Sequence, residues 1–160
     1  MQAQEIVAYR KDMDWEEYLV PRSLDEALEM LERYRGAARV IAGGTDIVPA
    51  SRKGAPGMRA LVDITRIPGL DAIKLAGETV KIGPLVTHTE AALSALIRER
   101  GMALAEGASR LGSPQIRNIG TVAGNVINAQ PGADTLIPLL ALDGSVTIMN
   151  RKGERTVPLA

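Results

Sequence analysis

The chain of 160 residues contains no cysteine and a single histidine, His88. Without cysteine it forms no disulfide, offers no thiolate nucleophile and provides no thiolate ligands for an iron–sulfur cluster. One histidine argues against a zinc site of ordinary ligand composition. The sequence therefore predicts no metal site in this chain.

Aromatic residues and an excess of one charge are also missing. The chain has no phenylalanine, one tryptophan and three tyrosines, so it lacks the side chains on which single-stranded nucleic acids stack. Its 19 lysines and arginines equal its 19 aspartates and glutamates, which removes the basic footprint of a nucleic-acid-binding protein. We expect no nucleic-acid partner, and any bound anion must be met by local donors.

Long hydrophobic runs do not occur either. Residues 1–18 are mixed and charged, without the apolar stretch of a signal peptide, and no segment approaches the length of a membrane span. With 46% hydrophobic and 24% charged residues, the composition is that of a folded globular protein. The sequence predicts a cytoplasmic protein without a membrane span.

The first part of the chain predicts an amphipathic helix between short strands. Ser23 is a suitable N-cap, acidic residues follow it, apolar residues recur at helical spacing, and Gly36 provides a stop. Further patterns predict strands at 18–21, 38–43 and 59–64 and a short helix at 47–54. Together they indicate a β-α-β unit in which the helix is buried on a small sheet.

The rest of the chain predicts a second unit. Alternating runs on both sides of Gly77 are typical of a β-hairpin. The remaining patterns predict helices at 88–100 and 101–112, a polar segment at 113–134, an apolar helix after it, and a strand or hairpin around Gly144 and Gly153. The predicted fold class is α+β, with an N-terminal extension (1–12), a first subdomain (13–62) and a second subdomain (63–160).

Two stretches rich in glycine carry the functional signal. The first, "VIAGGTDIV" at 40–48, is called here the first glycine segment; its glycine pair and Thr45 favour an anion-binding nest of backbone N–H groups. It matches neither the G-x-G-x-x-G dinucleotide fingerprint nor the lysine-bearing loop of nucleoside triphosphatases. Taken alone, Gly43 and Gly44 are better explained by a strand-to-helix turn that needs positive φ.

The second glycine segment is "NIGTVAGN" at 118–125. Within a few positions Thr121, Gly124 and Asn125 offer a hydroxyl group, bare backbone and an amide side chain. Two such loops suit a diphosphate, which carries two negative charges. In a chain without a basic patch, amide and hydroxyl donors from both loops would satisfy these charges.

These residues also resemble a known family. "AGGTD" (42–46) and "SPQIRNIGTVAGNVINAQPGAD" (113–134) are similar to the FAD-binding subunit, or medium chain, of molybdenum hydroxylases of the xanthine dehydrogenase and carbon monoxide dehydrogenase type. The resemblance runs from about Asp14, including "YLVPRSLDEALEML", to Ala160. It implies a two-subdomain FAD-binding fold of the molybdopterin dehydrogenase or vanillyl-alcohol-oxidase-like type. Family members usually continue beyond this length, so we expect their further C-terminal domain to be missing here.

The resemblance implies a non-covalent FAD site. Its residues would be Val40, Ile41, Ala42, Gly43, Gly44, Thr45, Asp46 and Ile47 of the first glycine segment, with Leu111, Thr121, Val122, Ala123, Gly124, Asn125 and Asp134. Both glycine segments would hold the pyrophosphate, Asp134 would lie near the sugar, and Leu111 would make an apolar contact. Ala123 stands where the family usually has glycine, and its methyl group would narrow the approach to the phosphate.

Several nearby residues have two possible roles. Arg117 either neutralises phosphate or braces the loop through backbone carbonyls. Asp134 either contacts the cofactor or caps the following helix. His88, at a predicted helix start, is interpreted as structural rather than as a catalytic group or an anchor for flavin. Asn128 and Gln130 are equally consistent with hydrogen bonds inside their own loop.

The function implied by the resemblance is electron transfer. In the family a molybdenum subunit oxidises the substrate, an iron–sulfur subunit relays electrons, and FAD passes them to an external acceptor such as NAD. The molybdenum cofactor and the iron–sulfur clusters would then reside on partner subunits, and this chain needs no catalytic side chain. The alternative is a non-catalytic assembly module that keeps the fold without tightly holding flavin. A covalent-flavin oxidase acting alone is a third reading, weakened by the lack of substrate-side residues.

Overall fold

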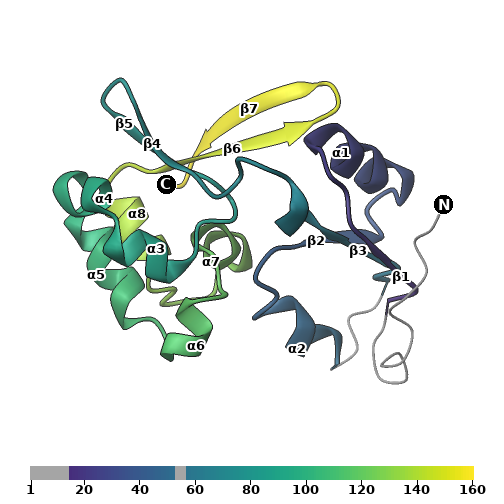
Figure 1. The fold of residues 1–160 in the computed structure, drawn as a ribbon, viewed down its shortest axis with the longest axis horizontal. Coiled ribbons are helices and arrows are strands. Elements are labelled where there is room, and N and C mark those ends of the chain that lie inside the picture. Colours follow the sequence, from purple (N-terminus) through teal and green to yellow (C-terminus); the bar gives the residue numbers. More distant parts are fainter. Residues whose placement is uncertain (1–14, 53–56) are drawn as a thin grey trace.

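The structure is a computed structural model that describes residues 15–52 and 57–160, and it has the predicted α+β fold. Figure 1 shows two bodies side by side. The sheet lobe contains β1 (Glu17–Leu19), α1 (Leu24–Arg33), β2 (Ala38–Ile41), α2 (Ile47–Ser51) and β3 (Ala60–Asp63). The helical lobe contains β4 (Ile73–Ala76), β5 (Thr79–Ile82), α3 (His88–Leu93), α4 (Ala95–Arg100), α5 (Met102–Arg110), α6 (Pro114–Arg117), α7 (Val122–Asn128), α8 (Leu136–Ala141), β6 (Ser145–Asn150) and β7 (Gly153–Pro158).

The sheet lobe is built on three parallel strands in the order β1-β3-β2. The predicted strands and the first helix are confirmed, and β3, the last of the three in sequence, lies between the other two. Buried Ala27 packs α1 against this sheet, in a cluster completed by Ala38, Ala60, Val62, Ile64 and Ile67. The short helix α2 is confirmed as far as Ser51, and the rest of its predicted range reaches residues outside the described part.

Local chemistry sets the bounds of α1. The Ser23 hydroxyl accepts a hydrogen bond from the Glu26 backbone N–H at 3.2 Å, as expected of an N-cap. After the last turn, Arg35 and Gly36 both take positive φ, which reverses the chain toward β2. The predicted start and stop of this helix are therefore confirmed.

The first helix predicted for the helical lobe is divided in two. A single helix was predicted over 88–100, but α3 and α4 are separate and Ser94 lies between them with ψ of 120°. Its hydroxyl accepts a hydrogen bond from the Ile97 backbone N–H, so the residue that ends α3 also caps α4. The break folds α3 and α4 onto α5 around a core of Val86, Ala91, Ala92, Ile97, Leu104, Ala105, Ala108 and Val122.

The second glycine segment was predicted to be a loop, and this is wrong for its second half. Residues from Val122 onward form α7, with Thr121 as its N-cap. The threonine hydroxyl accepts a hydrogen bond from the Gly124 backbone N–H at 3.0 Å. Gly124 and Asn125 have poor helix propensity, so the composition suggested a loop. The Thr121 cap offsets this poor propensity and allows the helix to form.

The β6–β7 hairpin connects the two lobes. It leaves the helical lobe and reaches across to α1, as Figure 1 shows. At its tip the Arg151 guanidinium donates a hydrogen bond to the Glu32 carboxylate at 2.9 Å. A groove of about 370 Å³ lies between α1 and this tip, away from both glycine segments.

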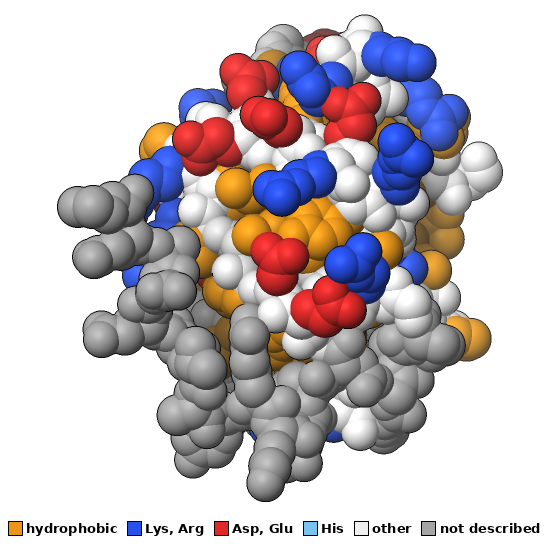
Figure 2. Space-filling model, turned by 90° about the vertical axis from the view of Figure 1, so that its right-hand side faces the viewer, with side chains coloured by type: hydrophobic (Ala, Val, Ile, Leu, Met, Phe, Trp, Pro, Cys, Tyr) orange, Lys and Arg blue, Asp and Glu red, His pale blue; other side chains and the backbone are white. Residues whose placement is uncertain are grey.

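The face of the molecule on the α1 side carries both signs of charge. Figure 2 shows acidic and basic side chains interspersed around a hydrophobic patch, with neither sign dominating. The ion pairs of Arg59 with Glu16 and of Arg151 with Glu32 show the same mixing. Within residues 15–52 and 57–160, no helix has the length and apolar character required to cross a bilayer.

Candidate functional site

The first glycine segment follows β2 and turns into α2. Gly44 has φ of +72°, a conformation that favours glycine, and its carbonyl accepts a hydrogen bond from the Val48 N–H at 3.1 Å. Within the described residues, the backbone N–H groups of Gly43 through Ile47 and the Thr45 hydroxyl have no hydrogen-bond acceptor. The turn therefore leaves a run of free donors, as the nest interpretation requires.

Gly43 is needed for a different reason. A Cβ atom at Gly43 would lie 2.0 Å from the Ile119 carbonyl oxygen and 3.0 Å from the Gly120 Cα atom. Ile119 and Gly120 belong to the second glycine segment, so the two glycine segments touch through backbone at this point. The tertiary structure therefore brings together two stretches that are separated by most of the helical lobe in sequence.

A short antiparallel bridge between Thr87 and Thr121 holds the second glycine segment in place. The His88 N–H donates to the Gly120 carbonyl at 3.1 Å, and the Val122 N–H donates to the Val86 carbonyl at 3.0 Å. Thr87 also forms a capping box at the start of α3, in which its hydroxyl accepts from the Glu90 N–H and its own N–H donates to the Glu90 carboxylate. The cap thus fixes Thr87, whose bridge to Thr121 supports the segment.

The polar groups of the second glycine segment are partly used inside the protein. The Asn125 Oδ1 atom accepts hydrogen bonds from the Thr135 hydroxyl at 2.6 Å and from the Thr135 N–H at 3.4 Å. The Thr121 hydroxyl caps α7, whereas the N–H groups of Thr121 and Ala123 have no acceptor in the described part of the chain. These two backbone N–H groups are therefore free donors of this segment.

The predicted site residues differ in accessibility. Buried members of the set, whose side chains serve the core or a cap, are Ile41, Thr121 and Val122. Exposed members are Val40, Asp46 and Asp134, and the partly buried ones are Ala42, Gly43, Gly44, Thr45, Ile47, Leu111, Ala123, Gly124 and Asn125. Ile41 and Val122 therefore offer backbone rather than side chain to any ligand.

Two of the open alternatives are resolved by the hydrogen bonds. The Arg117 Nη1 atom donates to the carbonyls of Leu111 at 2.9 Å and Gly112 at 3.0 Å, so this arginine braces the chain before the second glycine segment. Asp134 does not cap α8, because Thr135 is the N-cap residue and makes no side-chain cap bond.

Two carboxylates influence His88 at the junction. Asp134 and Asp46 both act electrostatically on this ring and favour its protonated form. Burial has the larger effect and lowers the pKa of His88 below its ordinary value. The described residues contain no cluster of three or more His, Cys, Asp or Glu side chains that could hold a metal ion.

Sequence reasoning missed Ile119 and Gly120, whose backbone meets Gly43, and Thr135, which holds Asn125. Gly120 belongs to the second glycine segment, so the sequence showed that it has no side chain. The sequence did not show that Gly120 meets Gly43, because close approach between distant backbones leaves no local pattern.

Replacing Thr135 by valine should destabilise the helical lobe. Thr135 is completely buried, and the change keeps its shape while removing the donor to Asn125. We expect a loss of about 1–2 kcal/mol in the free energy of unfolding, measured by urea denaturation. Thr156→Val is the matched control, because Thr156 makes its hydroxyl contact on the exposed β6–β7 hairpin and should cost less than about 0.5 kcal/mol. Equal effects would contradict a structural role for the Asn125–Thr135 bond.

Comparison with known proteins gives a consistent set of relatives. A family model described as the FAD binding domain in molybdopterin dehydrogenase matches residues 11–160. The 6-hydroxypseudooxynicotine dehydrogenase complex subunit alpha of Paenarthrobacter nicotinovorans is 38% identical over 143 residues, covering 89% of this chain and 48% of that protein. The carbon monoxide dehydrogenase medium chain of Hydrogenophaga pseudoflava is 33% identical over 142 residues, covering 89% of this chain and 50% of the relative.

A solved structure extends the likeness to three dimensions. Carbon monoxide dehydrogenase from Hydrogenophaga pseudoflava, in a form that lacks the Mo-pyranopterin moiety of the molybdenum cofactor, matches with a TM-score of 0.86 and 32% identity. The match covers 92% of this chain and 51% of that one. The chain therefore spans about half the length of the relatives it matches.

Proposed function

Because the chain belongs to the family of FAD-binding domains of molybdopterin dehydrogenases, we propose that it binds FAD non-covalently between the first and second glycine segments. The observation that carries the proposal is the backbone contact at Gly43, which leaves no room for a Cβ atom and brings both segments to one place. Free backbone donors from both segments at this junction suit a diphosphate.

In the proposed site, backbone groups bind the diphosphate. The N–H groups of Gly43 through Ile47 and the Thr45 hydroxyl would donate from the sheet lobe, and those of Thr121 and Ala123 from the helical lobe. Asp134 and Asp46, both exposed, suit the hydroxyl groups of a sugar rather than the phosphates, whose charge they would repel. Leu111 would add an apolar contact. The full set proposed from the sequence, including Val40, Ile41, Ala42, Gly124 and Asn125, stays a prediction.

When bound, FAD would supply the redox chemistry by accepting and passing on electrons, while the residues of this chain bind, orient and shield it. We propose that the protein serves as the FAD-binding electron-transfer subunit of a molybdenum hydroxylase. Its electrons would come from an iron–sulfur subunit and leave to an external acceptor such as NAD. The molybdenum cofactor and the clusters are assigned to partner subunits, and the two-subdomain fold related to vanillyl-alcohol oxidase is part of the same proposal.

The test is the flavin itself. Purified protein should show a flavin absorption spectrum, and heat or acid should release all of it as FAD rather than FMN, because two diphosphate-binding segments imply a dinucleotide. Released flavin is identified by chromatography, and the denatured chain is examined for residual flavin absorption. Protein that takes up no FAD would instead support an assembly module, and flavin left on His88 would contradict non-covalent binding.

A further inference from the structure

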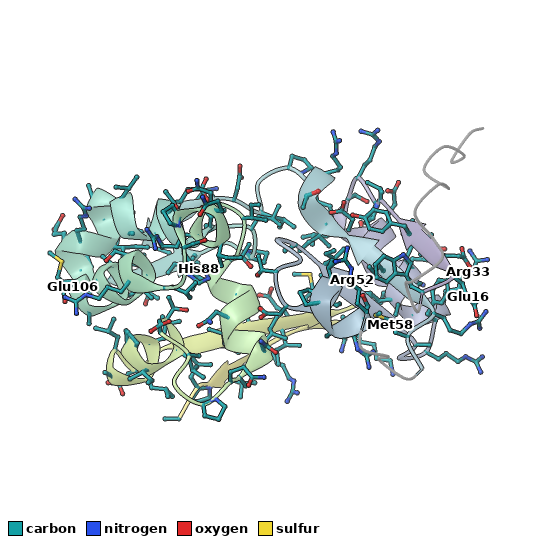
Figure 3. The ribbon with its side chains drawn as sticks, turned by 90° about the horizontal axis from the view of Figure 1, so that it is seen from below. Glu16, Arg33, Arg52, Met58, His88 and Glu106 are labelled. Carbon is teal, nitrogen blue, oxygen red and sulfur yellow. The ribbon has the colours of Figure 1, made fainter. Side chains whose placement is uncertain are left out.

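Within the part of the chain that the structure describes, His88 is the buried side chain with a polar atom that lacks a hydrogen-bond partner. The residue is 3% exposed at the start of α3, and its Nδ1 atom is the buried polar side-chain atom without a partner among the described residues. Buried polar groups in native proteins are nearly always paired, so an unpaired one requires an explanation. Figure 3 shows His88 within the helical lobe.

The ring lies at the junction of the two glycine segments. A Cβ atom at Gly120 would lie 3.3 Å from the His88 Cδ2 atom and 3.3 Å from the Thr45 hydroxyl oxygen. The imidazole edge that carries Cδ2 and its neighbour Nε2 therefore flanks the same glycine as the free hydroxyl of Thr45, from the opposite lobe. The bond from the His88 N–H to the Gly120 carbonyl fixes this placement.

The two ring nitrogens differ in their surroundings. Nδ1 is sealed without an acceptor, so placing a hydrogen there would bury an unsatisfied N–H group. Nε2 is not sealed in this way and has no acceptor within residues 15–52 and 57–160. The favoured state of the ring is therefore neutral with its hydrogen on Nε2. Burial opposes the charged form more strongly than Asp134 and Asp46 favour it, which agrees with a neutral ring.

We propose that His88 is a cofactor-binding residue, whose neutral Nε2–H group donates a hydrogen bond to the phosphate oxygens held at the junction beside Thr45. The inference rests on the proposed function, because it assumes that the diphosphate of FAD occupies this junction. It gives the Nε2–H group, which has no acceptor among the described residues, a role in holding the ligand, while Nδ1 stays bare and unpaired.

Two substitutions separate binding from structure. His88→Leu removes both nitrogens at similar size, and replacing an unsatisfied buried polar group by an apolar one leaves stability unchanged or raises it. We therefore expect the ligand-free variant to melt at or above the wild-type temperature while binding FAD roughly ten- to hundredfold more weakly. His88→Gln keeps an N–H donor at the position of Nε2 and should bind within about threefold of the wild type.

The protein's single histidine allows a direct measurement. With nitrogen-15 label in histidine, the spectrum of the free protein should show one protonated nitrogen, Nε2, and one bare nitrogen, Nδ1. Addition of FAD should shift Nε2 strongly and leave the ring neutral. A charged ring, a hydrogen on Nδ1, or an Nε2 signal that does not respond to FAD would overturn the proposal.

The outcomes distinguish this inference from the proposed function. If wild-type protein does not bind FAD, the proposed function fails first. If it binds and His88→Leu binds equally well, or loses stability and affinity together, His88 is structural and the inference alone is wrong. Leu93→Ala, on the same helix and 66% exposed, is the control and should change neither quantity.

Discussion

Gly43→Ala is expected to weaken FAD binding by about a hundredfold or more. The added Cβ atom would lie 2.0 Å from the Ile119 carbonyl oxygen, whereas real Cβ contacts are essentially never shorter than 3.0 Å. Both partners are backbone, so no side-chain rotation relieves the clash, and the two glycine segments must move apart. A displacement of about 1 Å is enough to break several hydrogen bonds to the diphosphate at once. Binding is followed by titration of FAD into the ligand-free protein with detection of flavin fluorescence.

Stability of the Gly43→Ala protein should fall as well, by about 1–3 kcal/mol, as is usual for overpacking. Gly77→Ala in the β4–β5 turn is the matched control. Gly77 has φ of +62° and a Cβ there would meet nothing within 4 Å, so the change strains the turn at a cost of about 1–2 kcal/mol without touching the junction. The control should lose stability and keep its FAD affinity. Wild-type affinity in Gly43→Ala would show that the Gly43–Ile119 contact is not part of the binding site.

Gly107→Ala should destabilise the protein, against the expectation from helix propensity. Gly107 lies inside α5, where alanine would ordinarily stabilise a helix by about 1 kcal/mol. Its Cβ position, however, lies 2.3 Å from the Asp134 carbonyl oxygen and 3.1 Å from the Pro138 side chain. Alanine therefore forces α5 away from the chain that leads into α8.

We expect a net loss of about 2 kcal/mol in the free energy of unfolding, which lowers the melting temperature by roughly 4–8 °C in a chain of this size. Calorimetry or urea denaturation measures it. FAD affinity should fall too, because Asp134 belongs to the proposed site and moves with its carbonyl. Glu106→Ala, at the exposed neighbouring position of α5, should change stability by less than about 0.5 kcal/mol. A stabilised Gly107→Ala protein would mean that the contact with Asp134 adjusts freely.

Elements specified by neighbouring residues could be predicted from the sequence. The Ser23 cap and the apolar spacing after it gave α1, and alternation around Gly77 gave the β4–β5 hairpin. Where two local preferences competed, prediction failed: Ser94 interrupts a continuous helical pattern, and the Thr121 cap makes a helix of residues whose composition suggested a loop. In both cases a hydrogen bond from a backbone N–H to a side-chain hydroxyl decides whether a helix begins there. The strength of this bond depends on the geometry of the surrounding chain.

The site divides in the same way. The sequence by itself determined which stretches carry glycine, hydroxyl and amide groups, and that this chain brings no thiolate and no excess of basic charge to an anion. Only the tertiary structure decided that Gly43 meets Ile119, that Gly107 meets Asp134, and that His88 is buried with one nitrogen sealed. Caps and turns depend on interactions over a few residues, and these leave a pattern in the sequence. Backbone contacts between distant segments depend on how the lobes pack. In the sequence, a glycine required by such a contact therefore cannot be distinguished from other glycines.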